Sequence, residues 1–252
     1  MHPWDNSIFG AVLKLAEARK KRIVKKTEPR LGRRGASTSG PGADGLARIA
    51  LDLFAERHFA AVSIKDIGRA ANVNSAMIYY YYADKGDLFR AAIESAINEA
   101  FGLFAKHCDT KKHENAADAI SAWFDVHVTL HKRLRNVVKI SLDCNGFIGN
   151  IPDVREPIER FYRHENDILK HIVREGIKGG IFKNADPSIV ATMISTSLDG
   201  VLARSLILKN FDMLKTVEEF KRALWLYLGY SPPKPKGRAG HQGRRSRPQP
   251  AE

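Results

Sequence analysis

Side chains that could hydrogen-bond to DNA are concentrated in one short stretch, SIKDIGRAANVNSAMIYYYYADK, which runs from Ser63 to Lys85. Apolar residues at helical spacing predict a short helix over 64–70, a tight turn over 71–73 and a second short helix over 74–81. Two short helices joined by such a turn form a helix-turn-helix, whose second helix can enter the major groove of DNA. The chemistry expected here is therefore recognition of bases and phosphates through hydrogen bonds.

The side chains at the start of the second helix are expected to face the base edges: Asn74, Ser75, Ala76 and Met77. Ser75 is the best polar candidate, because its hydroxyl can hydrogen-bond to a base or a phosphate. Asn74 is also a natural N-cap for the helix, while Ala76 and Met77 offer only apolar contacts, for example to a thymine methyl. This small set of base-reading groups indicates that DNA shape also contributes to specificity.

A second group of side chains is expected to contact the phosphate backbone: Ser63, Tyr79, Tyr80, Lys85 and Arg48. Lys85 would add positive charge beside a helix N-terminus, which itself favours phosphate. Ser63 can also cap the first helix, because Asp66 follows three residues later and nearly completes a capping box. Tyr81 and Tyr82 are expected to pack inward instead.

No residue pattern in the sequence indicates catalysis, and we predict no catalytic residues, no metal and no cofactor. The HExxH, P-loop and GxSxG motifs are absent. Cys108 and Cys144 form neither a zinc motif nor a disulfide framework, which is typical of two reduced thiols. His127 and His131 are four residues apart and could share a metal ion, but no third ligand is evident. A small helical enzyme that carries a helix-turn-helix is the alternative from another class.

The net charge of +13 lies almost wholly in the two ends of the chain. Residues 1–43 carry +7 and residues 231–252 carry +5, whereas residues 44–230 carry only +1. Charge alone therefore does not identify the central region as a DNA-binding unit. It leaves open a second alternative, a nucleoid-type protein that coats DNA through its basic tails.

Apolar residues recur at helical spacing throughout the central region, and no strand alternation of useful length appears, so the sequence predicts an all-α fold. One helix is expected to begin at Asp44 or Gly45, and another is expected to be capped by Asp84. The remaining helices are expected over 115–133, 136–147, 153–178, 187–209 and 216–229.

The N-terminal segment over 6–26 can form a basic amphipathic helix, and 29–43 is rich in Gly, Ser and Pro like a flexible linker. Three interpretations stay open: an arm that contacts DNA outside the core site, a membrane-surface helix, or an inert extension with the true start downstream of Met1. No run of about 18 apolar residues and no secretory signal appear, so we expect a cytoplasmic protein associated with the nucleoid through DNA, with no membrane partner.

The helix-turn-helix region resembles the TetR-type (tetracycline-repressor-like) regulators from about Gly40 to Ala100. The residues that match the family pattern are Ala50, Leu53, Phe54, Phe59, Ser63, Ile64, Ile67, Ala70, Ala71, Val73, Ile78, Tyr79, Tyr81, Tyr82, Lys85 and Leu88. Five positions depart from it: His58 replaces a usual Gly, Val62 a Thr, Gly68 an Ala, Asn72 a Gly and Tyr82 a Phe. Val62 removes a possible phosphate contact, and Asn72 is tolerable because Asn visits positive φ readily.

The composition of the two ends predicts a basic extension and linker over 1–39 and a disordered basic tail over 231–252. Between them the resemblance implies a three-helix helix-turn-helix domain over 40–100 and a helical effector-binding and dimerisation domain over 101–230. It further implies a homodimer that binds a palindromic DNA operator, most often as a repressor, and an unknown small-molecule effector. The effector's identity, the operator sequence and the sign of regulation are not implied.

Pocket and dimer residues are expected in the second domain. The candidate pocket residues, which are equally plausible as core, are Trp123, Phe124, His127, Phe161 and Tyr162. The expected dimer stripe comprises Ile189, Met193, Ile194, Ser197, Gly200, Val201, Arg204 and Leu208, joined by Phe220, Leu224, Trp225 and Leu228. Left uncovered in a monomer, these apolar stripes would form a large exposed patch.

Overall fold

The computed structural model describes residues 41–107, 113–146 and 154–233, and every regular element within these ranges is helical. The all-α prediction is therefore confirmed for the described part of the chain. The elements are α2 (Ala43–Arg57), the 3-10 turn η1 (Phe59–Ala61), α3 (Ile64–Ala71), α4 (Ser75–Tyr81), α5 (Lys85–His107), α6 (Ala116–Thr129), α7 (His131–Gly146), α8 (Arg155–Lys178), α9 (Pro187–Ile207) and α10 (Met213–Leu228). The N-terminal helix and the C-terminal tail expected from the sequence lie outside the described residues.

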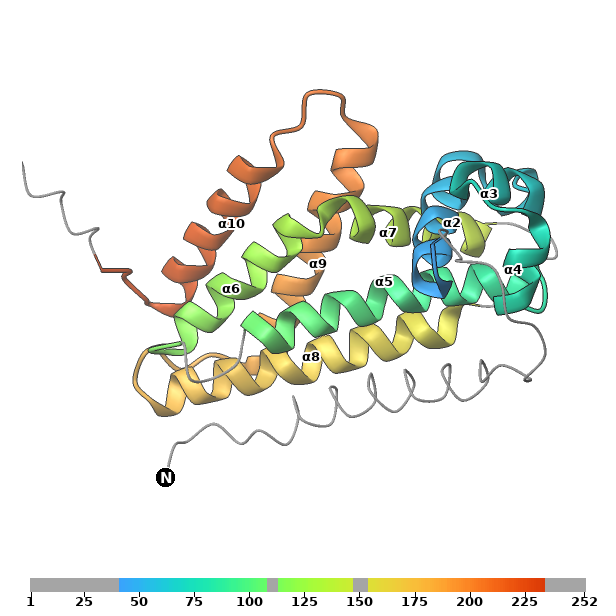
Figure 1. The fold of residues 1–252 in the computed structure, drawn as a ribbon. Helices are drawn as coiled ribbons and strands as arrows, with labels where there is room; N and C mark the ends of the chain where they lie inside the picture. Colours follow the sequence, from blue (N-terminus) through green and yellow to red (C-terminus); the bar gives the residue numbers. More distant parts are fainter. Residues whose placement is uncertain (1–40, 108–112, 147–153, 234–252) are drawn as a thin grey trace, which may run out of the picture.

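The helices form a small unit at one end of a larger bundle (Figure 1). The small unit consists of α2, α3 and α4, and the long helix α5 begins against α2 and continues into the bundle, where it packs on α6, α7 and α8. Helix α5 runs without interruption past residue 100, so the expected boundary between the two domains lies inside one helix. A movement in the bundle can therefore reach the small unit through a rigid element.

Helix boundaries differ from the expected ones at two places. The break between α6 and α7 falls at Leu130, whose N–H donates to the Val126 carbonyl, and not near residue 134. Helix α10 begins at Met213 and not at 216, because the Asp212 carboxylate accepts a hydrogen bond from the Lys215 N–H at 2.9 Å and caps the helix. Both differences arise from local end geometry, which apolar periodicity does not encode.

His58 ends α2 with a left-handed backbone, at φ 68° and ψ 148°. This region is almost restricted to glycine, because a Cβ collides with the neighbouring backbone. The family's usual glycine at this position therefore has a structural reason, and histidine here holds the backbone under strain.

We expect His58→Gly to raise the free energy of unfolding by about 1 kcal/mol, because the relief of strain exceeds the added entropy of the unfolded chain. Urea denaturation followed by circular dichroism measures the change. His58→Ala is the matched control, since it removes the imidazole and keeps the Cβ. Equal stability of the glycine and alanine variants would contradict the strain argument.

Candidate functional site

Ser63 and Asp66 fix the start of α3 through the expected capping box. The Ser63 hydroxyl oxygen accepts from the Asp66 N–H at 3.1 Å, and the Asp66 carboxylate accepts from the Ser63 N–H at 2.9 Å. The Ser63 hydroxyl also donates to the Asp66 carboxylate at 2.5 Å, and this bond, together with the one from the Ser63 N–H, holds the pKa of the Asp66 carboxyl below its usual value. The Ser63 hydroxyl is thus already engaged within the cap, and its contact with a DNA phosphate stays a prediction.

The turn between α3 and α4 is tight because of two residues that depart from the family pattern. Asn72 adopts a left-handed conformation at φ 53°, the conformation that its side chain tolerates better than most. At Gly68, an added Cβ would lie 2.8 Å from the Val73 carbonyl oxygen. Gly68 therefore allows the chain after the turn to approach α3 more closely than an alanine would.

Helix α4 presents its first turn outward while one residue anchors it. The Asn74 side chain accepts from the Met77 N–H at 2.9 Å, which confirms Asn74 as the N-cap. Ile78 is fully buried against the core of the small unit, together with Ile67. Because of this anchor, Ser75 and Met77 are half-exposed and Ala76 is exposed at the helix start. The base contacts of these residues stay predictions.

The four consecutive tyrosines divide as the sequence predicts. Tyr79 and Tyr80 are 55% and 59% exposed, so both hydroxyls are available to a phosphate. Tyr81 and Tyr82 pack against the core. The Tyr82 hydroxyl donates to the Ala43 carbonyl at 2.7 Å, and burial raises its pKa. Tyrosine in place of the usual phenylalanine therefore ties the end of α4 to the start of α2.

Lys85 has a structural role that the sequence did not reveal. Its ammonium donates to the Phe59 carbonyl at 3.0 Å and to the Val62 carbonyl at 2.9 Å, and it lies 4.2 Å from the centroid of the Phe59 ring. Two of its three N–H donors are thus engaged inside the unit. Its predicted phosphate contact can use only the third, whereas Arg48 on α2 is exposed.

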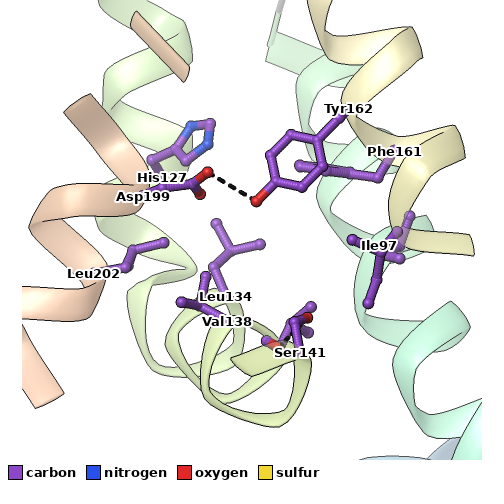
Figure 2. Close-up of a pocket in the computed structure, with 11 residues that line it drawn as sticks. Ile97, His127, Leu134, Val138, Ser141, Phe161, Tyr162, Asp199 and Leu202 are labelled. Atoms are coloured by element: carbon purple, nitrogen blue, oxygen red, sulfur yellow. Dashed lines mark hydrogen bonds between the residues drawn. The ribbon is translucent and has the colours of Figure 1, made fainter. Parts of the chain in front are cut away.

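A cavity with about 420 Å³ of empty space, including its opening, lies among five helices of the bundle (Figure 2). Seven apolar residues line it: Ile97, Leu134, Val137, Val138, Ile158, Phe161 and Leu202. Four polar residues complete the lining: His127, Ser141, Tyr162 and Asp199. A mostly apolar lining with a few polar groups is typical of a small-molecule site.

Only some of the predicted pocket residues lie at this cavity. His127, Phe161 and Tyr162 line it, but Trp123 and Phe124 do not. Trp123 is fully buried and stacks on Phe104, with ring centroids 3.7 Å apart, and Phe124 packs edge-on against Phe220. These two aromatic residues belong to the core of the bundle. The sequence missed Asp199 because α9 reaches the cavity only through the tertiary fold.

Two hydrogen-bonded pairs lie at or beside the polar end of the cavity. Tyr162 on α8 and Asp199 on α9 point toward each other, and the hydroxyl donates to the carboxylate at 2.7 Å (Figure 2). Glu165 is buried behind them and accepts from the Ser195 hydroxyl at 2.5 Å, while its other oxygen lies 3.7 Å from His127 Nε2. Burial raises the pKa of Glu165 to about 7 and lowers the pKa of His127 to about 4.

We expect Glu165→Gln to raise the free energy of unfolding at pH 8 by more than about 1 kcal/mol and to change it much less at pH 5. A raised folded pKa means that the protonated carboxyl stabilises the fold. This stability is complete below the unfolded pKa of about 4.5 and is lost as the pH rises through about 7. Urea denaturation across pH 5–8 measures it. Glu159→Gln, on the exposed face of the same helix, should leave the pH profile unchanged, and parallel profiles for Glu165→Gln and the native chain would refute the argument.

Helix α7 joins the cavity to the small unit. Leu134, Val138 and Ser141 line the cavity, while Asn136 donates from its side-chain amide to the Asp52 carboxylate of α2 at 2.9 Å. Arg133 of α7 also forms an ion pair with Glu99 of α5. A ligand that displaces α7 would therefore act directly on α2, against which α3 and α4 pack.

Helices α9 and α10 are apolar on two faces, which corrects the expected dimer stripe. Five of its members are buried inside their own chain: Ile194, Val201, Leu224, Trp225 and Leu228. The exposed apolar residues are Ile189, Ile207, Leu208, Leu214, Leu226 and Tyr227. A Cβ placed at Gly200 would meet nothing within 4 Å. The predicted stripe combined residues of the inward and outward faces of α9 and α10, because the periodicity of one chain does not show which face a neighbour covers.

The apolar character of α9 also has a bearing on membranes. Of the helices that the structure describes, α9 alone is long and apolar enough to cross a membrane by length and composition, with a mean hydropathy of 1.2. It packs against α8 and α7, and its inward face is buried in the bundle. The same two-sided apolarity is expected of a helix shared between a core and a subunit interface.

No cluster of three His, Cys, Asp or Glu residues with a metal-binding arrangement occurs within the described ranges. His127 Nδ1 faces the Trp123 carbonyl in its own helix, and His131 Nδ1, at the start of α7, faces the Val128 carbonyl near the end of α6. Cys108 lies outside the described residues.

Comparison with known proteins agrees with this geometry. Residues 48–92 match the model of the family described as bacterial regulatory proteins, tetR family. Two relatives are the biofilm operon icaADBC HTH-type negative transcriptional regulator IcaR of Staphylococcus epidermidis and the uncharacterized HTH-type transcriptional regulator YhgD of Bacillus subtilis. The first is 31% identical over 66 residues, which are 26% of this chain and 36% of IcaR. The second is 25% identical over 152 residues, which are 58% of this chain and 74% of YhgD.

The fold extends the likeness into the bundle. The structure of the transcriptional regulator FadR from Bacillus subtilis in complex with stearoyl-CoA superposes with a TM-score of 0.58 at 18% identity, covering 71% of this chain and 95% of FadR. At this identity the likeness concerns the fold alone. It confirms a helix-turn-helix unit followed by a helical domain. The names of these three proteins all describe transcriptional regulators.

Proposed function

This chain belongs to the TetR-type helix-turn-helix transcriptional regulators, and we propose that it is a dimeric repressor that leaves a palindromic operator when a small molecule enters the α5–α9 cavity. The observation that carries the proposal is the first turn of α4, which is held outward by the buried Ile78 and the Asn74 cap. A helix presented in this way can enter the major groove.

The proposed DNA contacts divide between base edges and phosphates. Ser75, Ala76 and Met77 at the start of α4 would face the bases, together with the Asn74 amide N–H groups that its capping role leaves available. Tyr79 and Tyr80 would donate hydroxyls to phosphates on either side, and Arg48 would add a charge from α2. The phosphate contacts would hold the helix in register while the base contacts select the sequence.

We expect Tyr79→Phe to weaken binding about fivefold on every DNA sequence, since one hydrogen bond to a phosphate is worth about 1 kcal/mol. Ser75→Ala should instead change the preference at particular base pairs. Binding to a randomised operator library, read by sequencing, separates the two effects. Tyr82→Phe is the matched control for loss of a hydroxyl, because that hydroxyl lies inside the unit. Identical, sequence-independent losses for Tyr79→Phe and Ser75→Ala would overturn these roles.

The proposed dimer uses the outward apolar face of α9 and α10. A two-fold dimer would cover Ile189, Ile207 and Leu226 and would let two chains approach closely at Gly200. It would also present two α4 helices to successive major grooves, which lie about 34–36 Å apart. The proposal of a palindromic operator follows from this symmetry.

The proposed release uses the path through α7 and α5. A ligand between Leu134 and Val138 on one side and Phe161 on the other would shift α7, and the Asn136–Asp52 bond would pass the shift to α2. The two α4 helices would then no longer fit successive grooves, so DNA affinity would fall. The name of IcaR as a negative regulator, and stearoyl-CoA in the FadR structure, support repression and effector binding in relatives.

The nucleoid-coating alternative predicts binding without sequence preference. A gel shift of the full chain on its own promoter, with excess nonspecific DNA as competitor, distinguishes the two functions. Retention of the promoter fragment supports the regulator, whereas equal competition by all DNA supports the coating protein.

A further inference from the structure

The hydrogen-bond donors at the polar end of the cavity are already engaged with the protein. The Tyr162 hydroxyl donates to Asp199, and the Ser141 hydroxyl donates to the Val137 carbonyl at 2.7 Å. His127 Nδ1 lies 3.0 Å from the Trp123 carbonyl oxygen, which can only accept, so the proton of the ring is on Nδ1. Each lining group with a polar hydrogen therefore directs it toward another protein atom.

The hydrogen-bonding capacity that is left consists of acceptors. Burial lowers the pKa of His127, which keeps the ring neutral, and its Nε2 lies 3.7 Å from a Glu165 carboxyl oxygen. The Asp199 carboxylate accepts from Tyr162 through one oxygen, and the other oxygen can accept further bonds.

The charge at the cavity has the same sign as these acceptors. Among the described residues that line the cavity, Asp199 is the one with an acidic or basic side chain apart from His127, and none is a lysine or arginine. An anionic ligand head would meet the Asp199 carboxylate with no lining cation to balance it, which is unfavourable, whereas a cationic head would be stabilised there.

On these grounds we propose that the effector is an amphipathic amine: an apolar body with a cationic, hydrogen-bond-donating head that binds Asp199. This inference rests on the proposed effector site and specifies its ligand class. Leu134, Val138 and Phe161 provide the apolar walls for the body. The carboxylate or phosphate head of a fatty acid or acyl-CoA does not fit this lining.

Isothermal titration calorimetry of the full chain tests the proposal with three probes that share one alkyl tail: decylamine, decan-1-ol and sodium decanoate. We expect the amine to bind most tightly and the decanoate most weakly. Asp199→Asn should weaken decylamine binding by about tenfold or more, because a charge-assisted hydrogen bond becomes a neutral one. It should leave decan-1-ol binding nearly unchanged, since asparagine keeps the shape and an acceptor oxygen.

Asp167→Asn is the matched control, because it removes an acidic charge from the exposed face of α8 and should leave decylamine binding unchanged. A thermal melt of Asp199→Asn reports whether that variant is folded. The Tyr162→Phe variant, in which both Asp199 oxygens are free, should retain or improve amine binding. Decanoate binding as tightly as decylamine, equal amine affinity of Asp199→Asn and the native chain, or no binding of any probe would each overturn the proposed ligand class.

The same probes separate this inference from the proposed function. Decylamine that binds the cavity but leaves the operator complex intact would refute effector-controlled release and support the ligand class. Decanoate that binds and releases DNA would refute the ligand class and support effector-controlled release.

Discussion

The Gly200→Arg variant is expected to be monomeric and to lose about 100-fold or more of its affinity for a two-half-site operator. Gly200 lies on the outward face of α9, where a Cβ would meet nothing within 4 Å in the single chain. The fold of the monomer therefore has room for the longer side chain. In a two-fold dimer, the same position on both chains would bring two bulky cations into an apolar interface. Loss of the second half-site removes an avidity of about 10²–10⁴.

Gly102→Arg is the matched control for this experiment. Gly102 lies on α5, and it too has nothing within 4 Å of an added Cβ. Both variants replace a glycine that lies in a helix and has open space around it, so any effect of helix propensity or added charge is shared. Sedimentation velocity gives the oligomeric state, and fluorescence anisotropy gives affinity for the full operator and for one half-site. A Gly200→Arg protein that stays dimeric would show that the interface lies on another face.

The Trp123→Ala variant is expected to lose about 3–5 kcal/mol of unfolding free energy, the usual cost of removing a large buried aromatic side chain. Trp123 is fully buried, and its ring stacks on Phe104 at an interplanar angle of 10°. The cavity that the truncation leaves would be enclosed by α5 and α6, so the surrounding helices could close it only in part. Chemical denaturation at pH 7 measures the loss.

Phe161→Ala is the comparison that separates core from cavity. Phe161 is half-buried and lines the effector cavity, so its truncation should cost less stability and should change ligand binding more. If Trp123→Ala lost less than about 1 kcal/mol while altering ligand binding, Trp123 would belong to the pocket after all. Equal stability losses for the two variants would also contradict the assignment.

The features that the sequence determined by itself are those built from residues close together in the chain. Ser63 with Asp66 and Asn74 with the Met77 N–H are caps within three residues, and the structure contains both. The left-handed Asn72 and the inward Ile78 are likewise set by local backbone and helical periodicity. The helix-turn-helix could therefore be predicted, together with the all-α fold, because its geometry repeats in a short span.

Tertiary structure alone decided which side chains meet across long sequence separations. Lys85 has the same charge whether it faces a phosphate or the carbonyls of Phe59 and Val62, and only the packing of α5 on η1 selects the carbonyls. Asp199 follows Tyr162 by 37 residues in the sequence and reaches the cavity from a different helix. Periodicity shows that a helix has an apolar face but not what covers it, which is why Trp123 and the inward face of α9 were assignable only from the fold.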